Sequence, residues 1–290
     1  MNRRSALAGI LCMLASACKR TADVGELPPE LRALLAVGRD FGEYAETAEA
    51  EAAFELRQIA SRMTAARGHR AAAISETLFG ALGFVREVTD TDLSFVLLPS
   101  VLRGRRGSCV GLGSLYLALA ELLGVPATGV MLPGHFYVRV IEGGRRRNVE
   151  LLRRGEELPE SWYRERYPIP GGAAPAYGRA LSANEVRGVV EFDVGNERRR
   201  QGRILEARRA YQRATQHFPD FAEAHGSLGA VLHVLGQLDA AAETYDRAER
   251  TYPSLPGLRD NIALLRAERA ARTGRQGPNE SHAPPAAEGP

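Results

Sequence analysis

The last third of the chain repeats itself at a spacing of 34 residues. Six positions recur at this spacing: Gly195 and Gly229, Gly202 and Gly236, Ala207 and Ala241, Tyr211 and Tyr245, Ala214 and Ala248, and Pro219 and Pro253. A fixed period of this length indicates a stack of helix pairs, in which each unit buries its apolar face against the next. The small residues permit close packing within a pair, and the proline ends the second helix.

The period and its residue pattern resemble the tetratricopeptide repeat. Two repeats are visible, and Asn261 to Arg269 continues the pattern for one more helix, which is expected to cap the stack. We therefore predict an all-α repeat region over residues 183–270, with a surface for a protein partner. Residues 271–290 are rich in Gly, Pro, Ala and polar residues and are predicted to be disordered.

Upstream of the repeats, the hydrophobic period changes from helical to alternating near Gly124. Helical spacing predicts helices over residues 29–66, 70–83 and 109–123, with a short helix or turn over 92–103. Alternation predicts strands over residues 125–132, 136–141 and 146–152, with a turn at Gly143-Gly144. Helices followed by an antiparallel sheet predict an α+β domain over residues 30–182. Within it, residues 153–182 are expected to be an irregular surface loop.

A possible catalytic constellation lies in this domain. Cys109 begins a Leu-rich helix after Arg105 and Arg106, and a helix N-terminus with nearby cations favours the thiolate. His135 lies on a strand 26 residues later, and Glu150 lies 15 residues beyond it, which is a strand-turn-strand distance. A hairpin would bring His135 and Glu150 side by side, facing the helix. A nucleophile, a base and a group that orients the base are the parts of an acyl-transfer site.

The same residues fit three other interpretations. Gly107-Ser-Cys-Val-Gly111 fits the G-x-nucleophile-x-G elbow of α/β-hydrolases, which needs a buried strand directly before it. The basic residues that precede Gly107 make a poor buried strand. The elbow fold also needs parallel strand–helix units between the nucleophile and the histidine, and the 26 residues from Cys109 to His135 are too few to form them. A metal site at Cys109, His135 and Glu150 has no supporting ligand-pair motif. In the third interpretation, Cys109 is a small buried helix residue and His135 is a hydrogen-bonded histidine in a turn.

Three stretches carry a family resemblance: Leu78 to Phe84, Arg105-Arg-Gly-Ser-Cys109 with its helix, and Leu132-Pro-Gly-His-Phe136. Together with the repeats they resemble the transglutaminase-like superfamily, in the SirB1-type branch, where a papain-like core precedes tetratricopeptide repeats. The resemblance implies Cys109 as nucleophile and His135 as base. The third superfamily residue is usually an Asp followed by Pro. Here Glu150 is followed by Leu151, and Asn148 is the alternative, by similarity to the asparagine of papain-like proteases.

The pattern of the N-terminal residues is typical of a targeting segment. Arg3 and Arg4 precede an apolar run over residues 6–17, which is too short to span a bilayer because about 20 residues are needed. We predict a signal peptide over residues 1–17 and a tether over 18–29. Small residues directly before Cys18 resemble a lipobox, which implies lipidation of Cys18 and a membrane-anchored lipoprotein of the bacterial cell envelope. The alternative is a plain signal peptide cut near Ala17, giving a secreted or periplasmic protein.

Charge and cysteine count argue against two classes of protein, those that bind nucleic acid and those held together by disulfides. A net charge of +3 is too small to argue for nucleic acid, and three cysteines, two of them in the first twenty residues, do not make a disulfide framework. No motif calls for a cofactor. The sequence predicts cysteine-dependent acyl transfer or hydrolysis on a protein, peptide or amide substrate. The alternative is an inactive transglutaminase-like fold that serves as a scaffold through its repeats.

Overall fold

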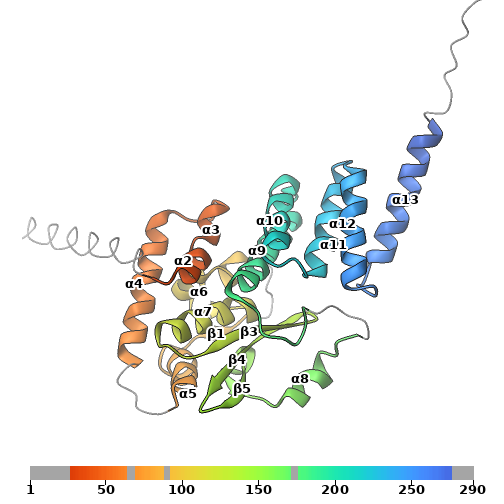
Figure 1. Cartoon of the computed structure of the whole chain (residues 1–290). Helices are drawn as coiled ribbons and strands as arrows, with labels where there is room; N and C mark the ends of the chain where they lie inside the picture. The colour runs from red at the N-terminus through yellow and green to blue at the C-terminus, as the bar shows by residue number, and fades with distance from the viewer. Residues whose placement is uncertain (1–26, 64–68, 88–91, 171–175, 276–290) are drawn as a thin grey trace, which may run out of the picture.

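The computed structural model describes residues 27–63, 69–87, 92–170 and 176–275. It has a helical N-terminal part, a small antiparallel sheet and then a stack of helices (Figure 1), which confirms the predicted fold class. The predicted signal peptide, the cysteine at position 18 and the end of the predicted tail lie outside the described residues. Among the residues described, no helix combines the length and apolar character that crossing a membrane requires.

The N-terminal part is a set of mostly short helices: α2 (Pro29–Leu35), α3 (Val37–Asp40), α4 (Glu46–Met63), α5 (Arg70–Ser75), the π-helical turn η2 (Glu76–Ala81), the 3₁₀ turn η3 (Leu93–Phe95) and α6 (Leu98–Gly104). The helix predicted over residues 29–66 is therefore interrupted after Asp40. Gly42, with a φ of 74°, takes a left-handed conformation that no helix continues. The helical prediction for residues 70–83 agrees with α5 and η2.

Helix α7 (Cys109–Leu122) is the centre of the domain. Ten of its fourteen residues are buried, because it has apolar or small residues on all sides. It ends where Gly124 takes a φ of 63° and the amide of Val125 donates to the carbonyl of Ala120 over 2.8 Å, a C-cap that requires glycine at that position.

One face of an antiparallel sheet packs on α7. The sheet order is β3 (Ala127–Leu132), β4 (His135–Glu142), β5 (Arg145–Glu150) and β6 (Glu156–Glu157). The three predicted strands are present, and β4 begins at His135, one residue earlier than predicted. A two-residue parallel pair, β1 (Val85–Arg86) with β2 (Arg106–Gly107), lies directly before Cys109.

Residues 153–182 are not the irregular loop that the sequence predicts. They contain β6 and helix α8 (Glu160–Arg166), which lies on the sheet face opposite α7. Residues 176–181 run along the edge of β3, where the amide of Gly178 donates to the carbonyl of Met131 over 2.9 Å. The prediction failed because aromatic side chains of this segment bury against the sheet, although the segment is rich in Pro and Gly.

The repeat region is a stack of five helices: α9 (Ala183–Arg200), α10 (Ile204–His217), α11 (Ala222–Val234), α12 (Leu238–Thr251) and α13 (Leu258–Arg275). The period of 34 has a direct packing cause. Gly195 lies against the ring of Tyr211, and Gly229 lies in the same way against Tyr245; a Cβ on either glycine would come within 2.5 Å of a ring carbon. Helix α13 is the predicted extra helix, and it continues five residues past position 270.

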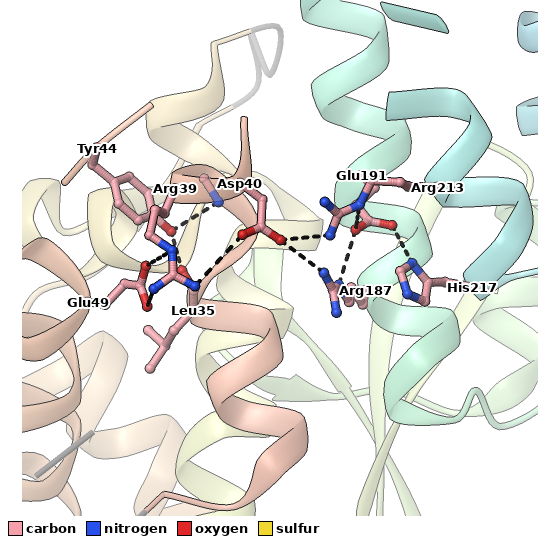
Figure 2. A network of polar contacts seen from close by, with 10 residues as sticks. Leu35, Arg39, Asp40, Tyr44, Glu49, Arg187, Glu191, Arg213 and His217 are labelled. Carbon is pink, nitrogen blue, oxygen red and sulfur yellow. Dashed lines mark hydrogen bonds and ion pairs between the residues drawn. The ribbon is translucent and has the colours of Figure 1, made fainter. Parts of the chain in front are cut away.

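The first repeat helix also belongs to the preceding domain. The valines on the inner side of α9 lie in the same hydrophobic core as α2 and α7. A polar network joins the two parts beside this core (Figure 2). Asp40 Oδ2 lies 3.2 Å from Arg187 Nη2 and 2.8 Å from Arg213 Nη2. The completely buried Glu191 pairs with Arg187, Arg213 and His217, with His217 Nδ1 at 2.6 Å. The stack is thus fixed to the domain by ion pairs and by shared apolar packing.

Candidate active site

Cys109 is the first residue of α7, and the residues around it fix the start of that helix. The N-cap Ser108 accepts a hydrogen bond from the amide of Gly111 through its hydroxyl at 3.2 Å, and its own amide donates to the carbonyl of Phe95 over 2.8 Å. Gly111 must be glycine, since a Cβ would lie 2.0 Å from that carbonyl oxygen. The half-buried thiol of Cys109 therefore stands at a rigid, positive helix end, which favours a thiolate.

His135 begins β4 directly after a two-residue turn. Pro133 and Gly134 form the turn, and Gly134 has a φ of 68°, as the third residue of a type II turn requires. One turn into α7, Gly113 packs on the ring of Phe136, so close that a Cβ would lie 2.5 Å from it. The start of β4 therefore lies beside the first turns of α7. Phe136 points toward α7, and His135, the residue before it in the strand, points to the opposite face of the sheet, where Tyr163 and Tyr167 lie, and not toward the helix as the sequence predicts.

His135 and Glu150 form a buried pair. His135 Nε2 lies 2.7 Å from Glu150 Oε2, and the two side chains are 2% and 1% exposed. The other carboxylate oxygen, Oε1, accepts the amide of Leu152 at 3.0 Å, which holds the carboxylate in place. Glu150 thus engages Nε2 and leaves Nδ1 as the ring nitrogen that can exchange a proton with a nucleophile.

Asn148 has a different environment. Its Oδ1 accepts a hydrogen bond from Arg139 Nε at 3.0 Å, and its Nδ2 lies 3.5 Å from the carbonyl of Leu158. Arg139 is the direct cross-strand partner of Asn148 in the register of β4 and β5. Of the two residues that the sequence left open for the third role, the structure brings Glu150, and not Asn148, to His135.

The sequence did not predict the aromatic side chains that cover the pair. Tyr167 stacks on the imidazole of His135, with ring centroids 4.2 Å apart and planes at 6°, and Tyr163 stacks on Tyr137 at 4.0 Å. Burial, and after it the charge of Glu150, raises the pKa of Tyr163, so its hydroxyl stays protonated. Tyr163 and Tyr167 are four residues apart, a spacing that puts both on one side of a helical turn and is the signal from which they could have been found.

The described part of the chain brings no three His, Cys, Asp or Glu side chains together in a way that would hold a metal ion. A thiol at a helix N-terminus, an imidazole and a buried carboxylate supply a nucleophile, a base and an orienting group.

A family model described as the transglutaminase-like superfamily matches residues 43–196, which is more than half of the chain. The protein belongs to the transglutaminase-like superfamily. A second family model, for the tetratricopeptide repeat, matches residues 192–256. A search of curated proteins gave no match. The order of a transglutaminase-like domain followed by tetratricopeptide repeats confirms the architecture that the sequence indicated, and repeats of this kind indicate protein–protein interaction.

Proposed function

We propose that the protein is an exported, lipid-anchored enzyme that transfers an acyl group from a peptide or amide substrate through a thioester on Cys109. The observation that carries this proposal is the buried 2.7 Å hydrogen bond between His135 and Glu150, at the strand end adjacent to the helix that Cys109 begins. A carboxylate that is buried with its histidine and hydrogen-bonded to it is the arrangement that orients an imidazole for proton transfer.

In this mechanism the Cys109 thiolate attacks the substrate carbonyl, and a C–S bond forms. The backbone N–H of Cys109 helps to bind the resulting oxyanion. The C–N bond then breaks, and the leaving amine takes a proton from His135. Water or a second amine, losing its proton to His135, attacks the thioester and releases the thiolate. Glu150 keeps the imidazole oriented and stabilises it when it is protonated.

Labelling with iodoacetamide tests the state of the thiol. We expect the alkylation rate of Cys109 to reach half its maximum well below pH 8.5, about the pKa of an unperturbed cysteine. The Cys109→Ala variant identifies Cys109 as the residue that iodoacetamide labels, but it does not report on the pKa of the thiol. The informative variant is His135→Ala, which keeps the cysteine and should label more slowly near neutral pH. A wild-type midpoint at or above about 8.5 would mean that Cys109 is a structural cysteine.

The proposed lipid anchor is tested separately. Small residues before the cysteine at position 18 motivate it, and we expect metabolic labelling with palmitate to mark the wild type but not the Cys18→Ser variant. The Cys12→Ser variant is the matched control, because Cys12 lies inside the proposed signal peptide and should leave labelling unchanged. An unmodified mature N-terminus near Ala17 would mean that the protein is secreted without an anchor.

A further inference from the structure

The hydrogen bond to Glu150 fixes one atom of the His135 imidazole and leaves the plane of the ring free. His135 Nε2 lies 2.7 Å from Glu150 Oε2, and a single hydrogen bond lets the ring turn about the line that joins these two atoms. Such a turn moves Nδ1, the nitrogen that is left to exchange a proton with a nucleophile. An imidazole that serves as a base therefore needs a second contact, one that fixes its plane.

The ring of Tyr167 makes this second contact. Its centroid lies 4.2 Å from that of the imidazole and the two planes differ by 6°, so the rings lie flat on each other. The ring of Tyr163, from the same segment, is 6.2 Å from the imidazole at 25°, and it stacks on Tyr137 instead. Of the two tyrosines that cover His135, Tyr167 is the one in a position to hold the imidazole plane.

The end of helix α8 sets the position of the Tyr167 ring. Tyr167 is the C-cap residue, and its amide donates to the carbonyl of Tyr163 over 2.8 Å. Pro168 comes next, and a residue before proline is disfavoured in the helical conformation, so Tyr167 leaves the helix with a φ of −128° and a ψ of 66°. The ring of Trp162 meets that of Tyr167 near its edge, with centroids 6.2 Å apart and planes at 64°. The backbone and Trp162 together restrict the ring of Tyr167.

We propose that Tyr167 is a positioning residue of the acyl-transfer site, which fixes the plane of the His135 imidazole while Glu150 fixes its Nε2. The two contacts leave Nδ1 as the ring nitrogen that can face a nucleophile. The face of a tyrosine ring also attracts a cation, and the His135 side chain is only 2% exposed, so the stack stabilises the imidazolium that forms when His135 takes up a proton. The effect on turnover rests on the proposed function, but the fixed imidazole plane does not.

Two substitutions of Tyr167 separate the ring from the space that it fills. Tyr167→Leu keeps an apolar side chain without an aromatic face, and Tyr167→Phe keeps the face. With p-nitrophenyl acetate as the substrate, we expect Tyr167→Leu to lower kcat by about tenfold and to leave KM within about twofold, because the ring acts on the base and not on the substrate. Tyr167→Phe should retain at least about half of the wild-type kcat.

Trp162→Leu is the matched control. It removes a larger ring from the same helix without removing the ring that stacks on His135, so kcat should stay within about threefold of the wild type. The melting temperature of each variant establishes that it is folded. Equal losses of kcat in Tyr167→Leu and Trp162→Leu, or a raised KM at unchanged kcat in Tyr167→Leu, would overturn the proposal.

NMR of the imidazole tests the fixed plane without any catalysis. The chain has six histidines, and the ring signal of His135 is the one that disappears in His135→Ala. In a Cys109→Ala background we expect one sharp ring signal with Tyr167 or Tyr167→Phe, and a broadened or split signal with Tyr167→Leu, because the ring then samples several orientations. A single sharp signal in Tyr167→Leu would overturn the proposal. If the signal broadens in Tyr167→Leu but the wild type does not turn over the ester, the acyl-transfer function fails and the fixed imidazole plane stands.

Discussion

His135→Ala and Cys109→Ala are each expected to abolish catalysed hydrolysis of an activated ester such as p-nitrophenyl acetate, with losses on the order of 10⁶ if the site works as a complete nucleophile–base unit. The reason is that a thiol without its base, or a base without its thiol, has no covalent route. Because the residues act as one unit, the double variant should be little worse than either single variant.

Glu150→Gln and Asn148→Ala test which of the two residues orients His135. A carboxylate that orients the base in such a unit is worth about 10⁴ in turnover, and glutamine keeps its shape without its charge. Asn148 contacts Arg139 instead of His135, so Asn148→Ala should retain turnover to within about tenfold. Far-UV circular dichroism and the melting temperature establish that each variant is folded. A Cys109→Ala protein with unchanged turnover, together with loss of partner binding on changing the repeat surface, would support the scaffold alternative.

Glu191→Ala is expected to destabilise the whole protein by about 3 kcal/mol. Glu191 is completely buried and contacts Arg187, Arg213 and His217 (Figure 2). Its removal leaves the two arginines with less compensating charge and His217 without this hydrogen-bond partner, in a poorly solvated place. This loss of stability is at the low end of the range for breaking a buried ion pair, because Arg187 and Arg213 retain their ion pairs with Asp40.

Asp40→Ala is the matched control from the other side of the same network. The Asp40 side chain is 26% exposed, and solvent screens its ion pairs, so the loss should be about 1 kcal/mol or less. Urea unfolding of both variants measures the difference. Equal destabilisation by the two substitutions would show that the burial of Glu191 does not determine how much its ion pairs contribute to stability.

The repeats were predictable because their packing is periodic. A glycine packed against a tyrosine ring recurs after 34 residues, so the same contact requires the same two residue types in both repeats. The start of α7 and the turn before His135 were predictable for a similar reason. Ser108 as an N-cap and Pro133-Gly134 as a turn are local signals, which do not depend on the rest of the fold.

The choice between Asn148 and Glu150 was not predictable from the sequence. The two residues are two apart on β5, so both side chains point to the same face of the sheet. The register decides between them: Arg139 lies opposite Asn148, and His135 lies near Glu150 at the end of the strand. Sequence spacing alone contains neither fact.

The aromatic residues that cover the His135–Glu150 pair were not predicted from the sequence for a different reason. Helix α8 is only seven residues long, and the spacing of Tyr163 and Tyr167 indicates a shared side of a turn but not what that side packs against. Tyr163 buries against a sheet face that only the tertiary fold creates. The contact between Tyr177 and Glu223 joins residues 46 apart in sequence, and no local pattern links the two.

The most direct test of the central claim is intact-mass spectrometry of the protein within seconds of mixing with p-nitrophenyl acetate. The account predicts one acetyl group on Cys109, removed by hydroxylamine, which forms in the wild type and in Asn148→Ala but accumulates far more slowly in His135→Ala and Glu150→Gln. Acetylation of Cys109 at the same rate in all four proteins, or none on Cys109 at all, would contradict the claim that Cys109, His135 and Glu150 form an acyl-transfer site.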